Sequence, residues 1–232
     1  MRRSPRAGIM DRVQRPSLPE GLLGRLRAEP GRAPETIALA AADFHGPAAA
    51  RWYAEQRGRY AYGPVQLAGM AKARHASLAR FGGAATGVGG LVTVIPDLVA
   101  LAWIQSRMVF FIAAAYGFDP QDPMRPAELL VLQDLYADPA SARAALDGAG
   151  QHVALAYADR RLAGSGDEQL VTKLLRFVSK RAARRLAGRL IPGVAVLFNA
   201  VANERDTRAL ADRCLRFYGG DDDGGEEGQA RP

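Results

Sequence analysis

The sequence predicts an all-α fold, a single multi-helix bundle that contains a glycine-rich apolar helical hairpin and carries disordered tails. Alanine and leucine recur at helical spacing through the middle of the chain, and almost nothing there alternates with the period of two typical of strands. Glycine and proline divide this region into segments of helical length. The 232 residues, 48% of them hydrophobic, are enough to bury one core. A sheet is not needed anywhere.

The two ends of the chain read as tails. Residues 1–33 mix proline, glycine and arginine without a repeating apolar face, and residues 219–232 are too polar to bury a core. We therefore expect a disordered basic N-terminal tail over 1–33, a helical domain over 34–218 and a disordered acidic C-terminal tail over 219–232. The first residues lack an apolar core of signal-peptide length, so we expect no export signal.

Turn-forming residues predict seven or eight helices between the tails. In "DPMRPAELLVLQDLYADP", for example, Pro126 can sit in a first turn, Asp138 and Pro139 can close the helix, and four leucines supply a buried stripe. These leucines are Leu129, Leu130, Leu132 and Leu135. The expected interruptions are Gly46-Pro47, Gly63-Pro64, Pro96, residues 117–126, Asp138-Pro139, residues 163–167 and Ile191-Pro192-Gly193.

The most apolar stretch runs from Arg80 to Asp119. Its uncharged part, 81–96, contains five glycines and is shorter than the roughly 20 residues of a membrane span, and Asp97 and Arg107 interrupt the apolar residues after it. A buried hairpin of two closely packed helices is therefore favoured, with Pro96 opening the second helix and Asp97 in its first turn. A hairpin that enters a bilayer in part, and a true span, are the alternatives.

A second informative segment, "KLLRFVSKRAARRLAGRL", covers residues 173–190. Its leucines and valine fall on one side of a helix and its cations on the other, so it can lie on anionic lipid or form the solvated face of a bundle helix. The membrane-surface candidates are Lys173, Arg176, Lys180, Arg181, Arg184, Arg185 and Arg189.

Charge and cysteine content bear on partners and compartment. The net charge of +7 divides into +4 over residues 1–35, where eight arginines oppose four acids, −4 over 220–232, and +7 for the body between them. Such a body suits an anionic partner, although the charges can also serve solubility alone. Nucleic acid is disfavoured, because Phe177 is the sole aromatic within the basic helix. The lone Cys214 excludes an intrachain disulfide and fits the cytoplasm.

Polar residues at positions where helical periodicity predicts burial form the one candidate site. We expect Asp97 to pair with Arg107, Lys180 or a later arginine, and Asn199 and Asn203 to share a helix face. Such a cluster either fixes helix register or binds a small polar ligand. Its members are His75, Asp97, Gln105, Arg107, Lys180, Asn199, Asn203 and Asp206.

Other chemistries find little support. His45, His75 and His152 are far apart in the sequence and no HExxH pair is present, so we expect no metal. The stretch "GGAATGVGG" lacks the Gly-Lys-Ser/Thr ending of a phosphate-binding loop, and Ser165 follows no strand. We predict no catalytic residue and no cofactor.

Two stretches together resemble the EcsC protein family. They are "HASLARFGGAATGVGGLVTVIPDLVALAWIQSRMVFFIAAAYGFD" and "KRAARRLAGRLIPGVAVLFNAVANERDTRALADRCLRFYG". The likeness lies in a histidine before a glycine-rich apolar helix, a Pro-Asp start, a Tyr-Gly-Phe-Asp end, and a basic helix leading into Ile-Pro-Gly with two asparagines beyond. It covers about residues 65–218. It implies a helical bacterial protein found with ABC-transporter systems, without an agreed enzymatic activity.

These observations predict a non-enzymatic helical protein associated peripherally with the inner membrane face or with a membrane transporter. The alternative is a soluble enzyme or small-ligand-binding protein that uses the polar cluster around Asp97. We expect the protein in the cytoplasm, peripheral to the inner membrane.

Overall fold

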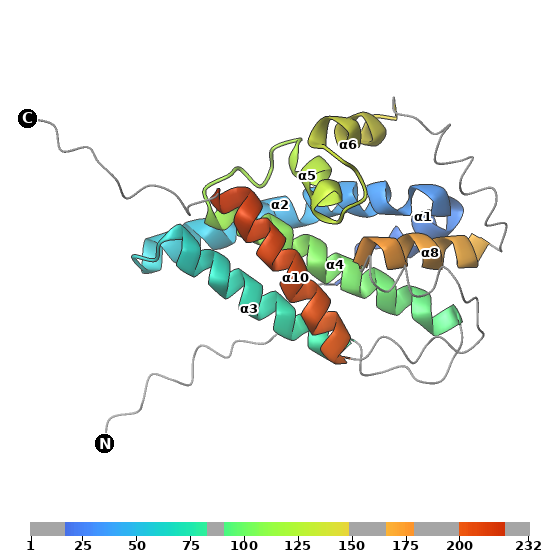
Figure 1. Ribbon diagram of the computed structural model, residues 1–232, viewed down its shortest axis with the longest axis horizontal. Coiled ribbons are helices and arrows are strands. Elements are labelled where there is room, and N and C mark those ends of the chain that lie inside the picture. Colours follow the sequence, from blue (N-terminus) through green and yellow to red (C-terminus); the bar gives the residue numbers. More distant parts are fainter. Residues whose placement is uncertain (1–16, 83–90, 149–165, 179–199, 221–232) are drawn as a thin grey trace, which may run out of the picture.

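The computed structural model describes residues 17–82, 91–148, 166–178 and 200–220 (Figure 1). Every regular element within these residues is a helix, which confirms the predicted all-α fold. The longer helices are α2 (Ala33–Arg59), α3 (Pro64–Gly82), α4 (Leu91–Ala115), α8 (Gly166–Val178) and α10 (Ala200–Gly219). The shorter ones are α1 (Leu22–Ala28), the 3-10 turn η2 (Pro30–Arg32), α5 (Arg125–Leu132) and α6 (Pro139–Leu146).

Helix α4 is the centre of the bundle. It packs against α2, α3, α8 and α10, so that other helices enclose it along its length (Figure 1). Its side chains are almost continuously apolar, which a helix surrounded by other helices requires. The contact between α3 and α4 forms the predicted helical hairpin, although the glycines at 83–90 lie outside the described residues.

One helix among the described residues is long and apolar enough to cross a membrane. It is the segment Ile95–Ala115 of α4, and 89% of its most apolar window is buried inside the protein. A core helix passes the same test of length and composition, and the enclosure of α4 by its neighbours is what a core helix shows.

Two prolines that the sequence marked as interruptions lie inside helices. Pro47 is within α2 and Pro96 is within α4, so Pro96 does not open its helix and Asp97 is not in its first turn. A proline in a helix interior removes one backbone hydrogen bond. Buried residues on both sides, such as Ala41 and Ala49 around Pro47, keep each helix continuous because packing outweighs this local cost.

Other predicted boundaries agree with the structure. Pro64 begins α3, Pro126 is in the first turn of α5, and Gly117 follows α4 with a φ of 85° that favours glycine. Asp138 does not close α5, which ends at Leu132. Its side chain instead accepts a hydrogen bond of 2.8 Å from the Ser141 amide and caps α6.

The folded body begins earlier than residue 34, the start predicted from the sequence. Helix α1 lies within the stretch that we predicted as a disordered tail, and the side chains of Leu22 and Leu26 are fully buried in the core. The sequence did not predict α1, because a helix of seven residues with two buried leucines is too short to show a repeating apolar pattern, and arginines and prolines surround it.

Candidate functional site

The predicted polar cluster separates into different places in the structure. Lys180 and Asn199 lie outside the described residues. Gln105 and Arg107 are both on α4, but Gln105 contacts α8 and α10 while Arg107 lies over Phe111. The buried Asn203 and the half-buried Asp206 lie on α10.

The predicted pair between Asp97 and Arg107 is absent. Both residues are on α4, ten positions apart, which is about 15 Å along a helix and beyond the reach of an ion pair. The charged group that acts on Arg107 is another cation, Arg74 of α3. The buried polar contacts of α4 are therefore made at Gln105 and Arg107 and are not centred on Asp97.

Gln105 is the centre of one buried hydrogen-bond network. Its amide nitrogen donates to the Val178 carbonyl and to the Thr207 hydroxyl, each at 3.3 Å, and its oxygen accepts from the Gln133 amide at 3.2 Å. The network connects α4 with the ends of α5 and α8 and with α10. Both ends of the Gln105 amide have partners, so the network acts as a structural junction.

A second polar cluster surrounds Trp103, Arg107 and Phe111, which are four residues apart and share one face of α4. The His45 ring of α2 lies 4.3 Å from the Trp103 ring, and the His75 ring of α3 lies 5.3 Å from the Phe111 ring, measured between centroids. The Arg107 guanidinium lies 4.9 Å from the Phe111 centroid. Three helices thus contribute to one cluster, which we call the Arg107 cluster.

The two histidines of this cluster are neutral at ordinary pH. Burial lowers the pKa of His45 to about 3, and the charge of Arg107 adds to this effect. Burial likewise lowers the pKa of His75 to about 3, although the carbonyl of Ala71, 2.7 Å from its Nδ1, opposes the shift. Because a carbonyl can only accept, the proton of neutral His75 is on Nδ1 and its Nε2 is an acceptor.

Several polar atoms of the Arg107 cluster lack hydrogen-bond partners within the described part of the protein. They are Nε2 of His45, Nε2 of His75, Nε1 of Trp103 and Nε of Arg107. His45, His75 and Trp103 are each at most 1% exposed. Buried polar atoms usually have partners, and a group of unpartnered ones around a single cation is a reason to look for a ligand. Helical periodicity predicted His75 and Arg107 as members of a buried polar cluster, but it indicated neither His45 nor Trp103.

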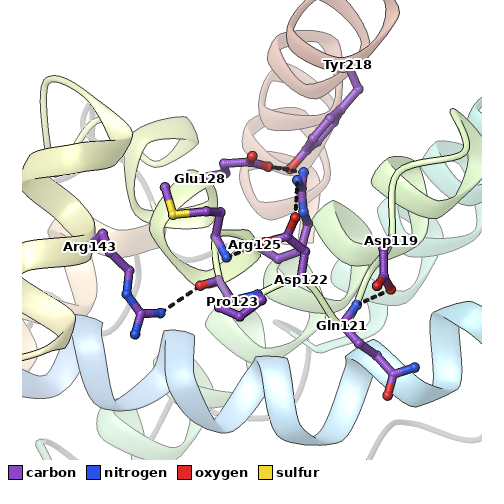
Figure 2. A network of polar contacts seen from close by, with 9 residues as sticks. Asp119, Gln121, Asp122, Pro123, Arg125, Glu128, Arg143 and Tyr218 are labelled. Atoms are coloured by element: carbon purple, nitrogen blue, oxygen red, sulfur yellow. Dashed lines mark hydrogen bonds and ion pairs between the residues drawn. The ribbon is translucent and has the colours of Figure 1, made fainter.

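A third network joins α10 to α5 and to the turn before α5, and the sequence did not point to it (Figure 2). The Glu128 carboxylate accepts a hydrogen bond of 2.7 Å from the Tyr218 hydroxyl and pairs with the Arg125 guanidinium. The Asp122 carboxylate lies 3.6 Å from the second terminal nitrogen, Nη2, of the same guanidinium. Burial raises the pKa of Glu128, while the Tyr218 hydroxyl and Arg125 oppose that shift. The carboxylate has its partners within the fold, which favours a structural role.

The described residues contain no group of three or more metal-ligating side chains. His45 and His75, which are far apart in the sequence, do approach the same face of α4, whereas His152 lies outside the described residues. Burial also raises the pKa of the Cys214 thiol to about 12, which keeps it protonated and unreactive.

The predicted basic helix is described only in its first part. Leu174, Leu175 and Val178 of α8 are buried, as its periodicity predicted, and Lys173 and Arg176 are half-exposed. The membrane-surface candidates Lys180, Arg181, Arg184, Arg185 and Arg189 lie outside the described residues.

The EcsC family model matches residues 65–219, about two thirds of the 232 residues. The chain belongs to the EcsC protein family. This confirms the resemblance predicted from the sequence. The match includes α3, α4, α5, α6, α8 and α10, whereas α1 and all of α2 precede it and still pack into the same core. Neither the comparison with curated proteins nor that with solved structures gives a match. His75 and Arg107 are within the matched region of this EcsC protein, and His45 is outside it.

Proposed function

We propose that this EcsC protein associates peripherally with an anionic phospholipid surface, the inner face of the inner membrane, through the loop that connects α2 to α3. Residues 57–65 form this loop and the adjoining helix ends, and we call them the tip. Every residue of the tip is exposed, and Val65 is 68% exposed. The exposed tip is the observation that carries the proposal.

Exposed aromatic and aliphatic side chains are concentrated at the tip. The rings of Tyr60 and Tyr62 stack with their centroids 4.9 Å apart, and Val65 follows them at the start of α3. On the outer side of α3 the exposed surface continues with Gly69 and Met70. Tyrosine is enriched where membranes meet water, because its ring is apolar and its hydroxyl is polar.

The charge of this region fits an anionic surface. No aspartate or glutamate occurs between Glu55 and Asp97, whereas five cations do. Arg57 and Arg59 are exposed at the tip itself, and Arg57 lies over the Tyr53 ring at 5.8 Å. Each cation near an anionic membrane contributes about 1 kcal/mol to binding. The remaining three cations are Lys72, which pairs with Asp212 of α10, Arg74 and Arg80.

The half-exposed cations of α8 are the competing contact surface. The tip and α8 lie at opposite ends of the protein in Figure 1, so a mutation can remove the charge of one without changing the other. A membrane transporter, the other partner that the sequence predicted, stays a prediction. So does the alternative of a ligand-binding protein or enzyme.

The proposal can be tested by flotation of the purified protein with vesicles of phosphatidylcholine, with and without phosphatidylserine, at low and moderate salt. We expect flotation with the phosphatidylserine vesicles that weakens as salt rises. Replacing Arg57 and Arg59 with glutamine should lower the floated fraction several-fold. The matched control replaces Arg25 and Arg205, two exposed arginines outside the tip, with glutamine. It removes two positive charges, as the tip variant does.

Each other outcome has a definite meaning. If the tip variant and the control lose flotation equally, net charge and not the tip determines binding. If replacing Lys173 and Arg176 abolishes flotation while the tip variant floats normally, α8 is the contact surface. A protein that stays in solution with both vesicle types refutes the proposal.

A further inference from the structure

The exposed edge of the Arg107 cluster carries two arginines, neither of which belongs to the tip. Half-buried Arg107 of α4 and exposed Arg74 of α3 lie on this edge. Arg74 directly precedes His75 in α3, and the Phe111 centroid lies 5.3 Å from the His75 centroid and 4.9 Å from the Arg107 guanidinium. The charge of Arg74 accordingly acts on Arg107. Within the described part of the protein, neither arginine forms an ion pair with a carboxylate. Among the described residues, these two like charges therefore act on each other without a carboxylate paired to either.

Burial makes this arrangement costly without an anion. A partly buried cation loses hydration, and a second cation nearby adds repulsion. Both effects lower the pKa of Arg107, burial more than the charge of Arg74. The contact between the Arg107 guanidinium and the Phe111 ring compensates only part of the lost hydration energy, because the face of an aromatic ring is only partially negative.

The residues behind Arg107 do not neutralise it. Burial keeps both His45 and His75 neutral, and the Arg107 charge lowers their pKa values further. Nε1 of Trp103 is a third buried atom without a partner among the described residues, and as an indole N–H it can only donate. In the part of the chain that the structure describes, the cluster and the adjacent Arg74 thus present two cations and an unused donor, and no carboxylate pairs with them.

We propose that Arg74 and Arg107 together bind a phosphate group at this edge of the cluster, with His45 and His75 as the layer behind it. A phosphate monoester carries close to two negative charges near neutral pH, which matches two guanidinium groups. Guanidinium groups bind phosphate oxygens in pairs, so two arginines can hold a tetrahedral group in a fixed orientation. A carboxylate offers one charge and two oxygens and satisfies only one of the arginines.

The phosphate can belong to a soluble molecule or to a lipid headgroup such as that of phosphatidic acid. Both present the same chemistry to the two arginines. Two experiments separate these sources, one with inorganic phosphate and the other with phosphatidylcholine vesicles that contain phosphatidic acid.

The test is histidine NMR of the full chain, because an anion bound close to Arg107 changes the electrostatic field at the imidazoles behind it. Sodium phosphate is added, and sodium acetate at equal ionic strength serves as the reference. We expect the resonances of His45 and His75 to shift with phosphate and not with acetate. Their assignment follows from His45→Gln and His75→Gln. Arg107→Gln should abolish the shift, whereas Arg25→Gln should leave it unchanged.

A variant at an exposed position guards against loss of folding. Arg74 is exposed, so Arg74→Gln should fold normally and weaken phosphate binding about tenfold, the effect of losing one charge-assisted contact. A phosphate response that persists in both arginine variants, or one that acetate reproduces, overturns the proposal. If vesicles with phosphatidic acid shift the histidine resonances and free phosphate does not, the headgroup is the source. No response to either probe also overturns the proposal.

Discussion

Burial, with the nearby charge of Arg107 acting in the same direction, keeps His45 and His75 neutral. Each imidazole is enclosed by apolar and aromatic side chains, and each is close enough to Arg107 for that charge to oppose its protonation. Arg74 acts in the same direction on His75, and the charged neighbours of either imidazole that affect its pKa are all cations. Folding therefore fixes the neutral form of both rings.

This neutrality predicts acid sensitivity. The folded protein binds a proton at these histidines only near pH 3, whereas the unfolded chain does so near pH 6.5. The unfolded state therefore binds more protons between these values, and stability falls as the pH decreases. Between about pH 7 and about pH 5, the free energy of unfolding should fall by up to about 2 kcal/mol for each histidine. Urea unfolding in phosphate-free buffer measures this.

The control is the His45→Gln and His75→Gln double variant, which keeps every carboxylate and His152. Its stability should depend less steeply on pH than that of the original protein over the same range. Equal slopes would mean that the two imidazoles are protonated in the folded state, which contradicts their burial beside Arg107.

Gly46 allows α2 to approach the loop after α4. A Cβ atom at this position would lie 2.9 Å from the Pro120 carbonyl oxygen, which is closer than real Cβ contacts. Gly46→Ala should therefore lower the free energy of unfolding by about 1–3 kcal/mol, since backbone has to move. The matched control is Gly69→Ala in α3, where nothing lies within 4 Å of the added atom. It should raise stability by roughly 0.5–1 kcal/mol. A neutral Gly46→Ala, measured by thermal unfolding, would contradict the close approach.

At the scale of the helices, Gln105 connects elements that are distant in the sequence. Replacing it with methionine keeps the approximate volume but leaves the Thr207 hydroxyl and the Gln133 amide without their partner. Gln105→Met should thus lower the free energy of unfolding by about 1–3 kcal/mol. The triple variant with Thr207→Val and Gln133→Met should recover part of this loss, because it replaces the remaining polar groups by apolar ones. The free energies of unfolding are measured with denaturant. If the losses of the three single substitutions simply add in the triple variant, the network is contradicted.

Helical periodicity and turn residues predicted most elements, but local rules failed at Pro47 and Pro96. A proline lowers the helix propensity of its own turn, and the sequence does not show that buried residues on both sides hold the helix together. The candidate site was likewise predictable only in part. Periodicity identified Gln105 and Arg107 as polar residues on a buried helix. It could not give the rotation of α2 and α3 about α4, which decides their partners.

At the scale of the whole molecule, the EcsC match covers only part of one folded body. Helices α1 and α2 both precede the matched residues, yet α1 packs against α2, η2 and α8, and α2 packs against α4. Buried apolar area stabilises a fold wherever it lies in the chain. The matched residues therefore depend for burial on a segment that the family model does not include.

This dependence predicts that α1 is needed for stability although its sequence looked like part of a tail. Leu26 is fully buried, so Leu26→Ala should lower the free energy of unfolding by about 2–5 kcal/mol, through lost burial and the cavity that remains. Leu23 is half-buried on the same helix, and Leu23→Ala should cost clearly less. Chemical denaturation of both variants measures the difference. Equal and small effects would place α1 outside the cooperative unit, and the folded body would then begin where the sequence predicted, near residue 34.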